Sequence, residues 1–268
     1  MGRGIAQAAA TCGYRTILFD PNQEVLSSAK HTIEEALKLL QQKGKISPIQ
    51  SEAIAERIGY STKVTDCIAD IIIEAIIEDP DAKQLLLMQL DELNSSETII
   101  ASNTSSLSVT TLAKSVTRPE RFAGMHFFNP PAIMKLVEIV RAEKTSEQTI
   151  AQLGSMALQL GKHAVICKDA PGFIVNRVAR PYYLEALRML EQDKATVEQI
   201  DLLMESTGFK MGPFRLMDLI GNDINYGVSK QVYEALGSPD RLKPSPVQQD
   251  MVKQGLLGKK SGSGYYNY

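Results

Sequence analysis

Hydrophobic residues follow two different rhythms along this chain. Up to Cys167, short apolar runs alternate with stretches in which apolar residues recur three and four positions apart, whereas from Phe173 onward only the second rhythm remains. A short bounded run predicts a strand, and the three-four spacing predicts one face of a helix. Alternating strands and helices are typical of a doubly wound α/β domain. We therefore expect an α/β domain over residues 1–168 and an all-helical domain over residues 169–268.

Two stretches predict their elements with particular clarity. The run from Ile71 to Ile77 is apolar except for Glu74, which suits a strand buried on both faces of a parallel sheet. The sequence Ser47-Pro48-Ile49-Gln50 combines a helix N-cap, a proline at the first helical position and a capping-box glutamine. Helices are expected near residues 2–10, 22–43, 48–58, 80–93, 175–191, 197–205, 214–236 and 246–254, and strands near 14–19, 70–77 and 98–102.

The beginning of the chain has the pattern of the later part of a dinucleotide-binding unit. Gly2 and Gly4 open the first helix, and Asp20 closes the strand that follows it. In such a unit the helix N-terminus receives the pyrophosphate, and the acid accepts the ribose hydroxyls, which favours NAD over NADP. No strand precedes Gly2, and the first two glycines of G-x-G-x-x-G are absent. Taken alone, Gly2 and Gly4 could equally be glycines at a frayed N-terminus rather than part of a phosphate-binding helix start. We expect the natural chain to begin earlier, with the missing strand.

The segment from Gly124 to Val140 carries two ionisable groups of catalytic type in apolar surroundings. His126 and Glu138 are separated by the Asn129-Pro130-Pro131 turn. A buried carboxylate needs a partner, and a carboxylate on one ring nitrogen of a histidine prepares the other nitrogen to take a proton. This is how a general base is built. The alternative is a histidine at a strand end and a glutamate on a solvated strand face.

Other polar residues fall where predicted strands end. Glu78, the loop 103–106 and His126 all lie at or just after such ends. In open α/β sheets the ligand binds beyond the carboxyl ends of the strands. The helical domain shows no ligand mouth of its own, so a cleft between the two domains is the expected site. This shared location favours a functional role for the histidine and the glutamate.

Composition excludes several classes of protein. With 268 residues, a net charge of −2 and 22% charged residues, neither nucleic acid nor an anionic membrane is an expected partner. Cys12, Cys67 and Cys167 are odd in number and lack a C-x-x-C spacing, which suits a reducing compartment and predicts no metal site. No apolar run reaches the roughly 18 residues of a membrane span. We expect a cytoplasmic, enzyme-sized protein.

Six segments of the chain carry a resemblance to a known family. The chain is similar to L-3-hydroxyacyl-CoA dehydrogenases over essentially its whole length, and most of all to the bacterial 3-hydroxybutyryl-CoA dehydrogenases. Members of the family have a strand and a G-x-G-x sequence before the equivalent of Met1. The matching segments are Met1-Gly2-Arg3-Gly4-Ile5-Ala6, Asn103-Thr104-Ser105-Ser106, His126-Phe127-Phe128-Asn129-Pro130 with Leu136-Val137-Glu138, Pro171-Gly172-Phe173-Ile174-Val175-Asn176-Arg177, Met211-Gly212-Pro213-Phe214 and Gly258-Lys259-Lys260-Ser261-Gly262.

The resemblance implies an activity and a role for individual residues. It implies NAD-dependent oxidation of a short-chain (S)-3-hydroxyacyl-CoA, with His126 as general base, Glu138 orienting it, and Ser105 and Asn176 binding substrate oxygens. The cofactor contacts that it implies are Gly2, Asp20, Glu78, Lys83, Asn103, Ser105, Asn129 and Lys260, and those to coenzyme A are Lys43 and Ser105. Five of these residues have a structural alternative: a turn serine at Ser105, a capping asparagine at Asn176, solvated lysines at Lys83 and Lys260, and a helix C-terminal lysine at Lys43.

Two other functions stay open from the sequence. A relative of gulonate dehydrogenases would oxidise a free hydroxy or sugar acid, although Phe127-Phe128 and Lys43 favour a CoA ester. A non-catalytic relative, or a chain with impaired cofactor binding, would keep the same residues without activity. The resemblance also implies a homodimer through the helical domain, in agreement with the many apolar residues after Phe173.

Overall fold

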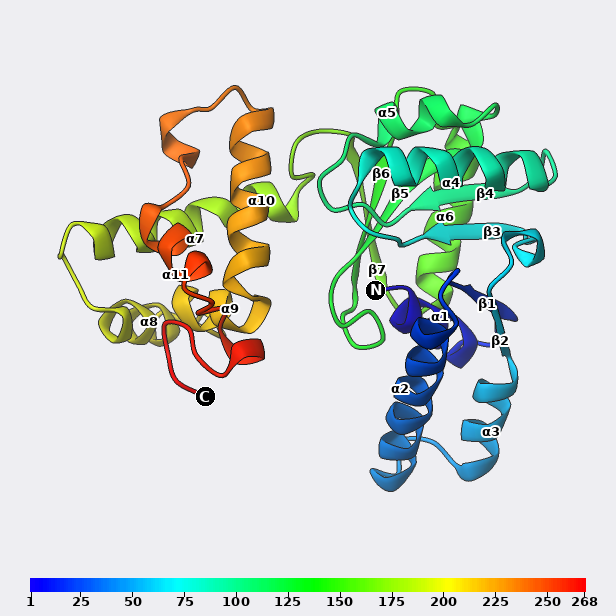
Figure 1. Cartoon of the computed structure of the whole chain (residues 1–268), viewed down its shortest axis with the longest axis horizontal. Helices are drawn as coiled ribbons and strands as arrows, with labels where there is room; N and C mark the ends of the chain where they lie inside the picture. The colour runs from blue at the N-terminus through cyan, green and yellow to red at the C-terminus, as the bar shows by residue number, and fades with distance from the viewer. The chain divides into compact units, whose positions relative to one another are not determined.

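The computed structural model describes all 268 residues, which form two compact units, Met1–Asp169 and Ala170–Tyr268 (Figure 1). The first unit combines helices with a parallel-dominated sheet, and the second is helical. The predicted fold class, a Rossmann-type α/β domain followed by an all-α domain, is confirmed. No helix combines the length and the apolar character that crossing a bilayer requires, and no cluster of side chains could hold a metal ion.

The first unit contains six α-helices and seven strands. Its helices are α1 (Gly2–Thr11), α2 (Gln23–Gln42), α3 (Pro48–Glu56), α4 (Pro80–Leu93), α5 (Val109–Leu112) and α6 (Glu147–Gln159). Its strands are β1 (Thr16–Phe19), β2 (Ile58–Ser61), β3 (Ile71–Glu74), β4 (Ile99–Ser102), β5 (Phe122–Phe127), β6 (Leu136–Arg141) and β7 (His163–Lys168).

The strands form a parallel pair, β1-β2, and a five-stranded sheet in the order β3-β4-β5-β6-β7. Strands β3, β4 and β5 are parallel, as are β6 and β7, but β5 and β6 are antiparallel. The reason is the short connection between them, because a parallel crossover needs about a dozen residues or more. This antiparallel pair turns the chain back on itself between residues 127 and 136.

Helices cover both faces of the larger sheet. Buried side chains of α6, among them Leu153 and Ala157, pack with Ile5 and Ala9 of α1 against the strands. Figure 1 shows α4 crossing the opposite face. At about 25 cal/mol per Å² of apolar surface removed from water, such packing supplies the main stabilisation of the unit. The packed sheet therefore holds the side chains at its strand ends in fixed positions.

Two sequence-based expectations for this unit were wrong. The helix predicted to reach Ile58 ends at Glu56, and Ile58 opens β2 instead, paired with Thr16 of β1. The strand predicted from Asp70 to Ile77 ends at Glu74, and Ile77 is 71% exposed. Since β3 is the first strand of the five-stranded sheet and pairs there with β4 alone, the side chains of Ile71, Ile72 and Ile73 are only partly covered.

The second unit is built from α7 (Val175–Glu191), α8 (Val197–Ser206), α9 (Pro213–Ile220), α10 (Asn222–Ala235) and α11 (Pro246–Lys253). Its core includes Leu187, Phe214 and Met217, each fully buried. The helical stretch expected from Phe214 to Leu236 is two helices rather than one. They are separated at Gly221, whose φ of 104° is a conformation that glycine adopts without strain.

Candidate active site

His126 on β5 and Glu138 on β6 lie directly opposite each other in the antiparallel pair. Opposed residues of antiparallel strands present their side chains on the same face. His126 Nδ1 is 2.7 Å from Glu138 Oε2, and the two residues are 6% and 1% exposed. The Phe128 ring lies 4.6 Å from the imidazole, centroid to centroid. A carboxylate on Nδ1 fixes the ring orientation and makes Nε2 the atom that would take a proton.

Asn103 connects three neighbouring strands at this end of the sheet. Its Oδ1 accepts a 2.8 Å hydrogen bond from the backbone N–H of Phe127, the residue after His126. Its own N–H donates to the carbonyl of Glu74 at 2.7 Å. Asn103 is buried, so water does not compete freely for either hydrogen bond. Asn103 thus fixes the end of β4 between the ends of β3 and β5.

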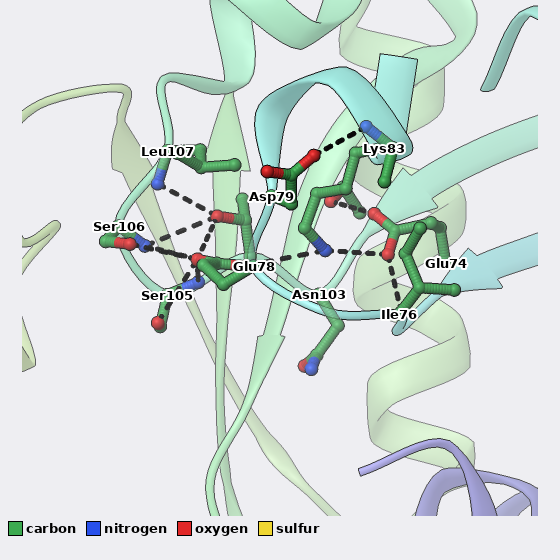
Figure 2. Close-up of polar contacts among 12 residues, drawn as sticks. Glu74, Ile76, Glu78, Asp79, Lys83, Asn103, Ser105, Ser106 and Leu107 are labelled. Atoms are coloured by element: carbon green, nitrogen blue, oxygen red, sulfur yellow. Dashed lines mark hydrogen bonds and ion pairs between the residues drawn. The ribbon is translucent and has the colours of Figure 1, made fainter. Parts of the chain in front are cut away.

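Glu78 holds the loop that contains Ser105. Its Oε1 accepts from the backbone N–H of Ser105 at 2.8 Å and of Ser106 at 3.1 Å, and from the Thr104 hydroxyl at 2.6 Å. Both serine hydroxyls also donate to it, at 3.3 and 3.0 Å (Figure 2). Burial alone would raise the pKa of Glu78, but the Thr104 hydrogen bond, the charge of Lys83 and the loop amides together lower it. The carboxylate is therefore ionised, and the loop is wrapped around it.

Lys83 is completely buried, which makes the alternative of a solvated surface lysine wrong. Its ammonium lies 2.7 Å from Glu74 Oε1 and 3.4 Å from Glu78 Oε2 (Figure 2). Sequence reasoning missed Glu74, which closes β3 with only 3% of its surface exposed. The signal was present, because Glu74 is a lone carboxylate in an apolar run, as Glu138 is.

Asn129 lies exposed in the connection between β5 and β6. Lys162, which the sequence did not single out, holds this connection: its ammonium donates to the carbonyls of Pro131 at 2.7 Å and Met134 at 2.8 Å. Burial lowers the pKa of Lys162. Pro131 lies so close to α1 that a Cβ atom on Gly4 would be 2.9 Å from its Cδ. The connection that carries Asn129 therefore packs against the first turn of α1.

Gly2 and Asp20 border the same region. A Cβ atom on Gly2 would lie 3.6 Å from Leu18 of β1 and 4.0 Å from Ala75, just after β3. The N-terminus of α1 receives no side-chain cap from Met1. Asp20 directly follows β1, is half-buried, and accepts a 2.9 Å hydrogen bond from the N–H of Asn22.

Lys43 lies apart from these groups. It is the exposed C-cap of α2, a helix of 20 residues whose N-terminal end follows Asp20. At 1.5 Å per residue, α2 is about 30 Å long, so Lys43 and Asp20 mark its opposite ends. The structure therefore does not bring Lys43 to the strand ends where His126 lies.

Asn176 and Lys260 belong to the second unit. Asn176 is in the first turn of α7, and its carbonyl accepts a 3.0 Å hydrogen bond from Arg180 Nε. Lys260 forms an ion pair of 2.6 Å with Asp223. The N-cap of α7 is Ile174, so Asn176 lies inside the helix and not at the N-cap position that the sequence left open.

Residues 1–170 match the family model of the 3-hydroxyacyl-CoA dehydrogenase NAD binding domain, and residues 172–268 match that of the C-terminal domain. The chain belongs to the 3-hydroxyacyl-CoA dehydrogenase family. The resemblance predicted from six segments is thus confirmed, and so is NAD as the cofactor.

Individual members of the family are similar over the whole chain. It is 41% identical to the mitochondrial hydroxyacyl-coenzyme A dehydrogenase of Sus scrofa, covering 100% of this chain and 88% of that protein. It is 44% identical to the 3-hydroxyadipyl-CoA dehydrogenase of Escherichia coli K12, again over 100% of this chain but only 57% of that longer protein. The solved structure of (S)-3-hydroxybutyryl-CoA dehydrogenase from Ralstonia eutropha matches with a TM-score of 0.95 and 38% identity, over 100% of this chain and 95% of that one.

The residues beside α1 have the chemistry that NAD requires. Backbone N–H groups at an uncapped helix N-terminus attract a pyrophosphate, and Gly2 leaves room for a close approach. Asp20 offers a carboxylate to ribose hydroxyls just beyond β1. The donor set therefore fits a dinucleotide of this family.

Proposed function

We propose that this protein catalyses the reversible, NAD-dependent oxidation of a short-chain (S)-3-hydroxyacyl-CoA to the 3-ketoacyl-CoA. The observation that carries the proposal is the buried His126–Glu138 pair, 2.7 Å apart, at the strand ends of an NAD binding domain of this family. Three members with similar sequences are named for hydroxyacyl-CoA, 3-hydroxyadipyl-CoA and (S)-3-hydroxybutyryl-CoA. All three names describe CoA esters with a 3-hydroxyl or hydroxyl group.

In the proposed mechanism His126 takes the proton of the 3-hydroxyl at Nε2. Glu138, hydrogen-bonded at Nδ1, stabilises the imidazolium that forms. Bound NAD would supply the acceptor for the hydride of C3. Ser105 and Asn176 would hydrogen-bond the substrate oxygens near the reacting carbon. A positioned general base of this kind contributes about 10²- to 10⁴-fold to the rate.

The cofactor would lie along the strand ends beside α1. Gly2 and the first turn of α1 would face the pyrophosphate, and Asp20 the adenosine ribose, where its charge repels the extra phosphate of NADP. We assign the nicotinamide half to the surroundings of Asn103, Ser105 and Asn129. Glu78 and Lys83 support this region through the loop contacts in Figure 2. Lys260 is a further proposed contact to the cofactor.

The test is steady-state turnover of acetoacetyl-CoA with NADH, compared with acetoacetate and NADH. Activity on the ester alone supports the proposal, whereas activity on the free acid alone would favour the gulonate-type alternative. Exposed Lys43 on α2 is the proposed contact to the CoA portion. The preference for acyl chain length is tested by comparing turnover of 3-ketoacyl-CoA substrates with acyl chains of about four, eight and sixteen carbons.

We further propose a homodimer through the second unit, which would then serve as a substrate and dimerisation domain. Several of its apolar side chains face solvent, including Val178 at 71%, Leu202 at 65% and Phe209 at 51% exposure. Burying these side chains against a second copy of the unit would remove apolar surface from water, which favours association. Light scattering at micromolar concentration tests the proposal, and a monomer would contradict it.

A cytoplasmic location is also proposed. The three cysteines, Cys12, Cys67 and Cys167, are all free thiols in the structure. Such thiols persist in a reducing compartment. Localisation of a tagged full-length chain in its own cell would test this.

A further inference from the structure

Glu74 has no role in the proposed mechanism, yet its carboxylate makes several of the polar contacts drawn in Figure 2. It is the last residue of β3 and only 3% exposed. Its Oε1 accepts from Lys83 Nζ and from the N–H of Ile76, both at 2.7 Å, and its Oε2 accepts from the Ser102 hydroxyl at 2.5 Å. Its carbonyl accepts from Asn103 N–H at 2.7 Å. One residue therefore connects the end of β3 to the end of β4 and to α4.

The ammonium of Lys83 depends on this carboxylate. Lys83 is completely buried, and a buried cation needs an anion close by. Glu74 Oε1 is at 2.7 Å and Glu78 Oε2 at 3.4 Å, so Glu74 is the nearer partner. Because the Glu74 carboxylate is also held by two other donors, the Ile76 N–H and the Ser102 hydroxyl, it keeps the ammonium in one place, from which Lys83 faces Glu78 (Figure 2).

Glu78 contacts both the Lys83 ammonium and the loop that contains Ser105. Its Oε2 faces Lys83, while its Oε1 accepts hydrogen bonds from Thr104, Ser105 and Ser106. A shift of the ammonium therefore moves the carboxylate on which the loop amides converge. The start of the same loop is fixed by Glu74 directly, through Ser102 and Asn103.

We infer that Glu74 is a positioning residue of this active site, which fixes the Ser105 loop through Lys83 and Glu78. The inference deepens the proposed function and rests on it for the role of Ser105. Its charge, and not only its shape, is required, because the ammonium between the two glutamates needs both carboxylates to stay in place.

The first test is amide hydrogen exchange of the full chain, which needs no activity. In Glu74→Gln, the amides of Ser105 and Ser106 should exchange faster, while β5 and β6 exchange as in the wild type. The matched control is Asp91→Asn; Asp91 is another buried carboxylate, on α4 rather than β3, and it binds Thr117 and Arg118. This variant should leave exchange in the Ser105 loop unchanged. Unchanged exchange at Ser105 and Ser106 in Glu74→Gln, or equal acceleration throughout the unit, would overturn the inference.

The second test separates positioning from stability. Glu74→Gln should lower kcat with acetoacetyl-CoA and NADH by about 10- to 100-fold, with a smaller change in the KM for NADH. In Lys83→Met alone, the buried Glu74 carboxylate is left without its cation. The double variant Glu74→Gln with Lys83→Met removes that charge as well, so its thermal stability should exceed that of Lys83→Met. Its kcat should stay low, because Glu78 has then lost its cation.

Two kinetic outcomes would also count against the inference, and both differ from a failure of the proposed function. A kcat that recovers with stability in the double variant, or an undiminished kcat in Glu74→Gln, would show that Glu74 only supports folding. If instead the wild type fails to turn over acetoacetyl-CoA, the proposed function is wrong, and the exchange experiment still decides whether Glu74 holds the loop.

Discussion

His126 Nδ1 and Glu138 Oε2 lie 2.7 Å apart at directly opposed positions of two antiparallel strands. The hydrogen bond therefore depends on backbone pairing rather than on flexible side chains, since both residues are buried in strands. Opposed strand residues keep their separation as long as the register holds. The register thus sets the orientation of the imidazole before any substrate binds.

We expect Glu138→Gln to lower kcat with acetoacetyl-CoA by about 10²- to 10⁴-fold, because the amide cannot stabilise a charged imidazolium. His126→Ala should cause a loss of the same order. Glu147→Gln is the control, an exposed glutamate that pairs with Arg141 of β6 and should leave kcat unchanged. Full turnover in Glu138→Gln would show that the carboxylate has no part in catalysis.

The contact between Gly4 and Pro131 predicts opposite effects for two glycine substitutions. Gly4→Ala would place a Cβ atom 2.9 Å from a stiff proline ring, so we expect it to reduce the free energy of unfolding by about 1–3 kcal/mol. Gly154→Ala, within α6, meets nothing closer than 4.0 Å and should raise it by about 0.5–1 kcal/mol. Urea unfolding of both variants tests the pair. Equal effects would mean that α1 yields to the added methyl group at no cost.

Lys162→Met tests whether the connection between β5 and β6 is held by the buried ammonium. The substitution keeps the apolar length but removes both donors to Pro131 and Met134, which should cost about 1–3 kcal/mol of unfolding free energy. We also expect faster amide exchange between residues 129 and 135 and weaker NADH binding. Lys135→Met, an exposed lysine of the same connection, should change stability by less than about 0.5 kcal/mol. If both variants behave alike, the Lys162 hydrogen bonds do not hold the connection.

The sequence predicted local features that depend on neighbouring residues. The helix start at Ser47 and Pro48 has the expected capping box with Gln50. The pairing of His126 with Glu138 could be anticipated because a short turn separates two apolar runs. Helix α7 has the predicted bounds, since its apolar spacing is regular and its core-facing residues are many.

Other features depend on contacts between distant residues, which no local pattern reveals. The sequence left a solvated surface lysine open as an alternative for Lys83, but this residue is buried by partners on the preceding strand and loop. Strand β2 has four residues, one of them Gly59, and its pairing with β1 outweighs the helical pattern that leads into it. Lys162 follows the C-terminus of α6, and the hydrogen bond of its ammonium to the distant Pro131 carbonyl is visible only in the folded chain.

Two C-terminal tyrosines donate hydrogen bonds to buried carboxylates. Tyr266 donates to Asp201 at 2.9 Å and Tyr268 to Asp218 at 3.2 Å. Burial and then the Asp201 hydrogen bond raise the pKa of Tyr266, and burial with the charge of Asp218 raises the pKa of Tyr268 to about 12, from an ordinary value of 10.0.

A raised folded-state pKa means that the folded chain keeps a proton that the unfolded chain loses. The associated stability is fully present below pH 10.0 and lost as pH rises through the folded value, about 12 for Tyr268. We expect the melting temperature to fall steeply across that window, together with the appearance of tyrosinate absorbance. Tyr266→Phe should be less stable at neutral pH, because Asp201 loses a donor, but should show a shallower alkaline fall. A wild-type melting temperature that stays level across the window, or an equally steep fall in Tyr266→Phe, would contradict the role given to this hydroxyl.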